Sequence, residues 1–184
     1  LGFYFFYPTY RGYYFNKNFM NRITKNWLSL LFALSLIAII SALTAEYLFD
    51  LAPCKMCLKQ RHPYYAIILL ILFFYLFQWR GKILLSILNE FAIIYGLFYS
   101  FWHVGIEQKI LPGPVSCSGV LSKTSSIQNL KEQINNQSIV NCADISWTII
   151  GLSAATINSI LLLLILIFNS IYILQNFYDQ KKIS

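Results

Sequence analysis

Charged side chains are scarce in this sequence, which has 14 Lys or Arg and 7 Asp or Glu among its 184 residues. That is 11% of the chain, whereas soluble domains average about 25%. A disordered chain is excluded, because disorder requires high charge together with low hydrophobicity. A soluble domain is excluded as well, since 58% of the residues are hydrophobic and one core of this size cannot bury so much apolar surface.

The few charges leave long stretches without any Asp, Glu, Lys or Arg. Residues 26–45, 62–79 and 145–178 have none, and residues 83–106 contain only Glu90. A bilayer core about 30 Å thick is crossed by roughly 20 apolar residues of helix, and backbone groups left open in lipid find no water partner. We therefore predict an all-α membrane protein, a four-transmembrane-helix bundle with spans at about 27–49, 58–79, 83–104 and 147–174.

Two flanks enclose this predicted membrane domain, residues 1–26 and a cytoplasmic tail at 175–184. Residues 1–19 hold ten aromatic side chains, and we expect translation to start at Met20, so that these residues are not native. The alternative is an aromatic anchor at the membrane interface. A signal peptide is disfavoured because the first apolar run continues to Phe49, beyond the roughly 7–15 residues of such a signal. The last span is longer than a membrane requires, so it tilts or begins as an interfacial segment.

The four cysteines form two pairs, Cys54 and Cys57 in the first loop and Cys117 and Cys142 in a loop at about 105–146. Two predicted spans separate these loops, so all four cysteines lie on one side of the membrane. The Lys and Arg counts do not decide the orientation, but disulfides persist outside the cytosol. We therefore expect both cysteine-bearing loops to be extracytoplasmic and both chain ends to be cytoplasmic.

A CxxC spacing at a helix start, as in Cys54 and Cys57, is typical of thiol–disulfide oxidoreductases. Four cysteines allow three pairings, and their spacing does not choose among them. Structural disulfides are one alternative, although a bridge across so short a loop restricts the unfolded chain only modestly. A zinc site of all four is another, although 24 residues separate Cys117 from Cys142, unlike the usual two to about four. We favour redox-active cysteines and expect no metal.

The residues around the CxxC favour a thiolate. Pro53 suits a helix start because it lacks only a donor that would be unsatisfied there. Cys54 and Cys57 then lie in the first turn, where the helix dipole favours negative charge. Arg61 lies on the same face, where a cation lowers a thiol pKa and can hold a carbonyl oxygen of a ligand. The alternative for Arg61, and the better explanation of Lys59, is an anchor reaching the headgroups.

His103 lies at the outer end of the third span, at the same predicted depth as the CxxC. An ionisable residue in a membrane helix is a functional candidate, and an imidazole can donate to a ligand oxygen or move a proton. Glu46, near the outer end of the first span, either joins a proton route or reaches headgroup water. For Glu90, nearer the inner face, we expect a packing partner.

The loop at about 105–146 is long enough to be functional. Residues 125–134 combine capping-box spacing with an apolar stripe, which predicts a short helix lying on the membrane surface. The turn at 111–114 is expected to bring Cys117 back toward the bundle. The loop can therefore present a disulfide to a soluble partner and carry the reduced thiol to the CxxC.

Four segments carry a resemblance to a known family, in the order PCKMCLKQRHP (53–63), FWHVGIEQ (101–108), PVSCSG (114–119) and CADISWTIIGLSAATIN (142–158). They look like the disulfide bond formation protein B (DsbB) family. The most specific feature is the CxxC followed by Gln-Arg, with a second cysteine pair in the next outer loop. The family consists of four-helix proteins of the bacterial inner membrane, which reoxidise the periplasmic thiol oxidase DsbA and pass the electrons to a bound quinone. The resemblance implies a quinone cofactor (ubiquinone or menaquinone) and, as partners, a DsbA-type protein and membrane lipid, without nucleic acid.

The resemblance also implies roles for the cysteines. Cys117 and Cys142 resemble the pair that meets reduced DsbA, with Cys117 as the sulfur that is attacked. Cys54 would then exchange with Cys142. Cys57 would pass electrons to the quinone as a thiolate.

Arg61 resembles the residue that stabilises that thiolate, and His103 resembles the quinone-side histidine of the family. Quinone-linked relatives of vitamin K epoxide reductase also combine a helical bundle with a CxxC, but on a late helix, whereas here it precedes the second span. The remaining alternative is a non-enzymatic membrane protein with two structural disulfides, which leaves Arg61 and His103 without a role.

Overall fold

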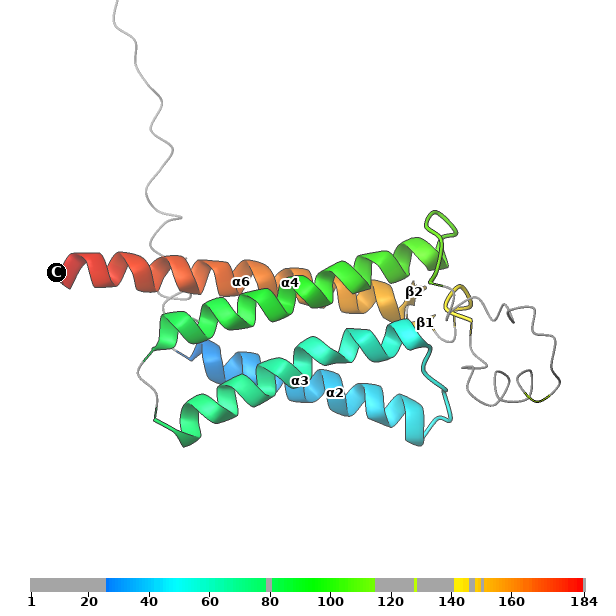
Figure 1. Ribbon diagram of the computed structural model, residues 1–184, viewed down its shortest axis with the longest axis horizontal. Helices are drawn as coiled ribbons and strands as arrows, with labels where there is room; N and C mark the ends of the chain where they lie inside the picture. The colour runs from blue at the N-terminus through cyan, green and yellow to red at the C-terminus, as the bar shows by residue number, and fades with distance from the viewer. Residues whose placement is uncertain are drawn as a thin grey trace, which may run out of the picture.

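The computed structural model of the protein describes residues 26–78, 81–114, 128, 141–145, 148–149 and 151–183. Four long helices run antiparallel and side by side through the described part of the chain (Figure 1). They are α2 (Trp27–Tyr47), α3 (Lys55–Leu76), α4 (Lys82–Glu107) and α6 (Ala154–Ile183). A short antiparallel hairpin, β1 (Thr148–Ile149) and β2 (Leu152–Ser153), precedes α6. Apart from this hairpin, the predicted all-helical architecture is confirmed in the described residues.

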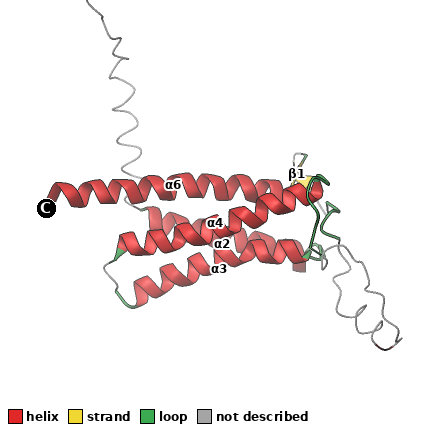
Figure 2. Ribbon diagram, turned by 45° about the horizontal axis from the view of Figure 1, so that its top comes forward, coloured by secondary structure: helices red, strands yellow, loops and turns green. Residues whose placement is uncertain are grey.

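Helix α4 packs against both α3 and α6, and α2 packs mainly against α3. Helices α3 and α4 pack tightly at Pro63 and Gly96, because a Cβ on Gly96 would lie 2.5 Å from Cγ of Pro63. Pro63 donates no backbone hydrogen bond to its own helix, and a glycine opposite leaves room for its ring. This contact holds α3 against α4, two of the helices that run along the bundle in Figure 2.

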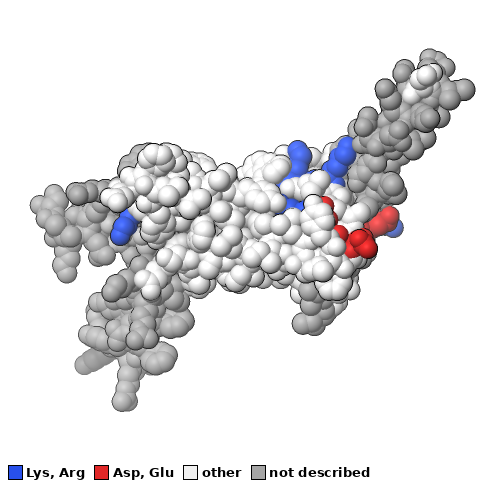
Figure 3. Space-filling model, turned by 90° about the horizontal axis from the view of Figure 1, so that it is seen from below, with Lys and Arg blue, Asp and Glu red and all other residues white. Residues whose placement is uncertain are grey.

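The outer surface of the bundle is apolar, as in a membrane protein. Ile37, Leu69 and Phe91 are 60%, 65% and 67% exposed. On the face shown in Figure 3, the charged side chains lie toward the two ends of the molecule and leave an uncharged band between them. Three of the described helices are long and apolar enough to cross a membrane, namely Trp27–Tyr47, Lys82–Glu107 and Ala154–Tyr178. Helix α3 has polar first turns with three basic side chains, so the four-span count stays a prediction.

The last predicted span, 147–174, begins too early, because α6 begins at Ala154; the helix continues to Ile183. The preceding residues form the hairpin, whose turn uses Gly151 at a φ of 78°, a conformation that glycine adopts without strain. Ser153 caps the N-terminus of α6, since its Oγ accepts a hydrogen bond from the Thr156 N–H at 3.2 Å. The chain after residue 174 contains no Gly or Pro to end the helix. The other three helices differ from the predicted spans by no more than three residues at either end.

Glu90 ties α4 to α6, which confirms the packing role predicted for it. It accepts hydrogen bonds from Asn169 Nδ2 and Ser170 Oγ. Asn169 is fully buried, accepts from Trp27 Nε1 at 2.9 Å and donates to the Ser86 carbonyl at 3.0 Å. One amide therefore connects α2, α4 and α6 toward the end of the bundle where α2 and α4 begin.

We expect Asn169→Leu to destabilise the protein by about 1–3 kcal/mol, because it leaves buried donors and acceptors on two other helices without a partner. The measurement is the unfolding midpoint of the purified protein in detergent. Asn176→Leu is the matched control on the same helix, since the Asn176 amide donates to the Tyr172 carbonyl of its own helix and, among the described residues, bonds to no other helix. Equal midpoints for the two variants would mean that the interhelical amide contributes nothing measurable.

Candidate functional site

The predicted CxxC lies at the N-terminus of α3, at the end of the bundle where α4 ends and α6 begins. Cys54 is the N-cap residue, with extended backbone, and its Sγ accepts a hydrogen bond from the Cys57 N–H at 3.2 Å. The sulfur thus takes the place of the Ser or Asp oxygen that usually caps a helix. Pro53 lies one residue before the cap, outside the first turn in which we expected it.

Cys54 and Cys57 are free thiols, and their sulfurs lie 2.9 Å apart, close enough to share one proton. The hydrogen bond with Cys57 lowers the pKa of Cys54 to about 4; burial opposes this shift, and the contact with His103 adds to it. The N-terminal end of α3 favours negative charge on the capping sulfur as well. The lowered pKa therefore favours Cys54 as the thiolate of the reduced pair near neutral pH.

His103 of α4 is brought together with the CxxC, as the matching depths in the sequence predicted. Its Nε2 lies 3.6 Å from Cys54 Sγ and 3.9 Å from Oε1 of Glu107, one turn further along α4. On the other side of the ring, Gln60 Nε2 lies 2.8 Å from His103 Nδ1. The imidazole is 3% exposed, so its partners are protein groups.

The thiols of Cys54 and Cys57 and the imidazole of His103 have ligand atoms within 4.8 Å of one another. Two thiolates and an imidazole are a donor set that suits soft cations such as zinc. The zinc site of all four cysteines considered above would also need Cys142 as a thiolate ligand, but Cys142 is in a disulfide.

Cys142 lies beside the CxxC. It is 1% exposed and packs in one buried cluster with Cys54, Met56 and Ile106. The disulfide partner of Cys142 lies outside the described residues. Cys117 and the surface helix predicted at 125–134 lie outside them too, except for Gln128, which is helical. The two loops predicted to cooperate thus meet at Cys54 and Cys142.

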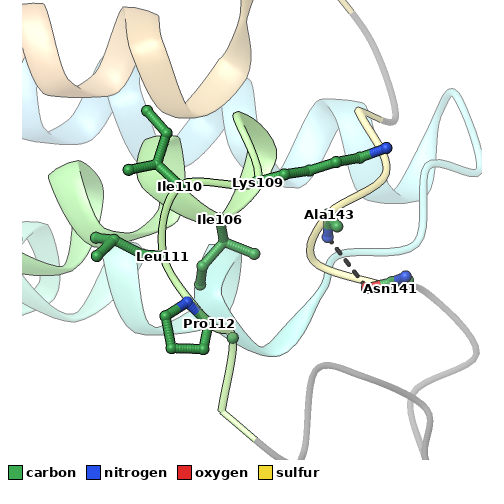
Figure 4. Close-up of a pocket in the computed structure, with 8 residues that line it drawn as sticks. Ile106, Lys109, Ile110, Leu111, Pro112, Asn141 and Ala143 are labelled. Atoms are coloured by element: carbon green, nitrogen blue, oxygen red, sulfur yellow. Dashed lines mark hydrogen bonds between the residues drawn. The ribbon is translucent and has the colours of Figure 1, made fainter.

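A hollow of about 360 Å³ opens beside the Cys142 segment (Figure 4). Its walls come from the chain that follows α4 and from the two neighbours of Cys142, Asn141 and Ala143. The Ala143 N–H donates to Asn141 Oδ1 at 3.1 Å, which holds the Cys142 turn. The segment carrying the disulfide is therefore ordered by local hydrogen bonds next to an open surface.

Arg61 lies one turn after Cys57 but turns toward α2. Its guanidinium forms an ion pair with Glu46 and donates to the Ala42 carbonyl at 3.4 Å. Within the described residues no hydrogen bond joins Arg61 to either sulfur, so the predicted contact is not made in this state. Glu46, for which a proton route or headgroup water was considered, is instead the counter-ion of Arg61. The Lys59 ammonium lies 4.9 Å from the centre of the Tyr99 ring.

Three further polar residues belong to this site, although the sequence alone assigned them no function: Gln60, Glu107 and Asn158. Asn158 of α6 donates through Nδ2 to Gln60 Oε1 at 3.1 Å, and Glu107 accepts from Ser153 Oγ. Glu107 could have been found from its spacing of four residues from His103, which puts both on one helix face. Gln60 and Asn158 could have been found from a weaker signal, because each is a polar side chain within an otherwise apolar span.

Comparison with known proteins adds family information to this geometry. The family model described as disulfide bond formation protein DsbB matches residues 24–172. The chain is also similar to the uncharacterized protein RP370 of Rickettsia prowazekii (strain Madrid E), with 31% identity over 140 residues, which cover 75% of this chain and 81% of that protein. No solved structure matches the chain. The family match covers α2, α3, α4, most of α6 and all four cysteines.

Proposed function

The chain belongs to the DsbB family of disulfide bond formation proteins, and from this premise we propose that it reoxidises a periplasmic DsbA-type thiol oxidase and passes the electrons to a membrane quinone. Membership of the family supports a broader statement, that the chain is a membrane protein that takes part in disulfide bond formation. The observation that carries the finer proposal is the burial of Cys54 and Cys142 in one cluster. That contact gives electrons a path between the loop disulfide and the CxxC.

In the proposed cycle, a thiolate of the reduced partner attacks Cys117 of a Cys117–Cys142 disulfide. The second partner thiol then closes the partner's own disulfide, and both loop cysteines are left as thiols. Cys142 attacks Cys54 of an oxidised CxxC, and Cys57 leaves as a thiolate. Cys117 next attacks Cys142 and releases Cys54. Two electrons and two protons have moved from the partner to the CxxC, and the loop disulfide has formed again.

The described oxidation state is the one that this exchange produces, with free thiols at Cys54 and Cys57 and Cys142 in a disulfide. A bound ubiquinone or menaquinone would supply an acceptor for the two electrons and two protons. Arg61 is the residue that we propose for holding a quinone oxygen. A guanidinium has five N–H donors, and among the described residues Arg61 donates to two acceptors, Glu46 and the Ala42 carbonyl. His103 is proposed to border the same site.

We propose that the four helices span the bacterial inner membrane. The proposal is needed most for α3, because its first turns are polar. Both chain ends are then cytoplasmic and the cysteine-bearing end is periplasmic. The antiparallel order of the helices supports this arrangement, since the start of α3 and the end of α4 lie at the same end of the bundle. The disulfide of Cys142 supports the periplasmic side, because disulfides persist outside the cytosol.

The test uses the purified full-length chain in detergent, with a reduced DsbA-type protein and a soluble ubiquinone analogue. Quinone absorbance and partner thiols are followed together. We expect one quinone reduced for each partner disulfide formed, and we expect Cys57→Ser to abolish both changes. If the quinone stays untouched while the four cysteines remain in disulfides, the chain is instead a membrane protein with structural disulfides.

Arg61→Ala is expected to raise the quinone concentration for half-maximal rate about tenfold or more, since a charge-assisted hydrogen bond contributes roughly 1.5–3 kcal/mol. Lys59→Ala is the matched control, a cation of the same helix turn that lies over Tyr99. Arg61→Lys keeps the counter-ion of Glu46 and so separates binding from folding. If the quinone concentration for half-maximal rate is unchanged in both Arg61 variants, Arg61 does not bind the quinone.

A further inference from the structure

A chain of hydrogen bonds runs from the bundle interior to His103. Tyr64 OH donates to Asn158 Oδ1 at 2.6 Å. Asn158 Nδ2 then donates to Gln60 Oε1 and to Ser100 Oγ, each at 3.1 Å. Gln60 Nε2 lies 2.8 Å from His103 Nδ1. Tyr64, Gln60 and His103 are all at most 7% exposed, so water does not replace these partners.

The direction of this chain fixes which nitrogen of His103 carries the proton. Because Gln60 Oε1 accepts from Asn158, the amide of Gln60 turns its NH₂ group toward the imidazole. An NH₂ group only donates, so Nδ1 must be the acceptor and the proton of the neutral ring must be on Nε2. Nε2 is the nitrogen that lies 3.6 Å from Cys54 Sγ.

We propose that Gln60 and Asn158 are positioning residues that hold His103 in its Nε2–H tautomer, so that the imidazole donates to the Cys54 thiolate. The role in turnover rests on the proposed function, but the tautomer does not. A proton on Nδ1 would face the NH₂ of Gln60 unless the amides of Gln60 and Asn158 both turned. His103 therefore stabilises the reduced CxxC as a hydrogen-bond donor and not as a base that removes the thiol proton.

The groups around the imidazole agree with a donor at Nε2. The titratable groups that face His103 are Cys54 and Cys57 at the start of α3 and Glu107 on its own helix. The thiolate of Cys54 and the carboxylate of Glu107 are acceptors, and both lie on the Nε2 side. Helix α6 contributes Asn158, which acts through Gln60 and carries no charge.

The test is ¹⁵N NMR of the histidine-labelled full-length chain, reduced, in detergent near neutral pH. The chain has two histidines, and a His62→Asn variant assigns the signals. Protonated and unprotonated ring nitrogens differ widely in ¹⁵N shift, so the tautomer is read directly. We expect the wild-type His103 to carry its proton on Nε2 and to have a bare Nδ1.

Gln60→Glu keeps the shape of the side chain but replaces the NH₂ donor by a carboxylate oxygen, so we expect a proton to appear on Nδ1. Gln108→Glu is the matched control, because it adds the same charge at an exposed position just past the end of α4. A wild-type proton on Nδ1, or no change in Gln60→Glu, would overturn the proposal. The NMR experiment needs neither quinone nor partner, so a failed oxidase assay with the expected tautomer would reject only the proposed function.

Discussion

Replacing Cys142 by serine will stop the chain from oxidising a reduced DsbA-type protein, with a loss of rate on the order of 10³-fold or more. The physical reason is that Cys142 is the only described cysteine outside the CxxC that shares the buried cluster around Cys54, so the CxxC loses its exchange partner. The CxxC itself will remain oxidisable by added quinone in this variant. The measurement is the rate of thiol loss from the partner, followed beside the oxidation state of Cys54 and Cys57 by thiol alkylation.

Ala143→Ser is the matched control for Cys142→Ser, because Ala143 packs at the edge of the same cluster and carries no sulfur. It places the same hydroxyl one residue further along the chain and should keep most of the wild-type rate. Partner oxidation by Cys142→Ser at more than a tenth of the wild-type rate would mean that electrons reach the CxxC without this disulfide.

The reduction potential of the Cys54–Cys57 couple will fall by about 30 mV per pH unit between about pH 5 and pH 8, half the slope of an ordinary dithiol. A two-electron couple loses about 30 mV per pH unit for each proton taken up, hence about 59 mV for two protons. Since the pKa of Cys54 is lowered to about 4, its thiolate persists above that pH and only Cys57 takes up a proton. The stabilisation of the reduced form is fully present above the ordinary thiol pKa of about 9, is lost progressively as the pH falls toward about 4, and makes the couple more oxidising.

The slope is measured by equilibrating the full-length chain with glutathione buffers across this pH range. His103→Ala should raise the pKa of Cys54, because the contact with His103 lowers it, so that the steeper slope extends to higher pH. His62→Ala is the matched control, an exposed histidine on the neighbouring helix. A slope of about 59 mV per pH unit in the wild type would show that both thiols are protonated and that the capped thiolate does not form.

Much of the fold follows from the sequence, because a membrane helix must be built from a continuous apolar stretch. The spans predicted from the charge-poor stretches agree with α2, α3 and α4 to within three residues at either end. The start of α6 was misplaced because the residues before Ala154 are as apolar as those after it, and only Gly151 and Ser153 mark the hairpin and the helix cap. Apolarity in a continuous run does not distinguish a strand from a helix.

For the site, the sequence by itself determined the reactive groups: a CxxC at a helix start, a second cysteine pair in a later loop, and one histidine at the same depth. These depend on spacing along the chain, which local rules can interpret. Only the tertiary structure decided the partners, pairing Arg61 with Glu46, Cys54 with Cys142 in one cluster, and Gln60 with His103. The physical reason is that a hydrogen bond or ion pair between helices depends on their rotation and depth, which packing contacts such as that of Pro63 with Gly96 fix across the bundle.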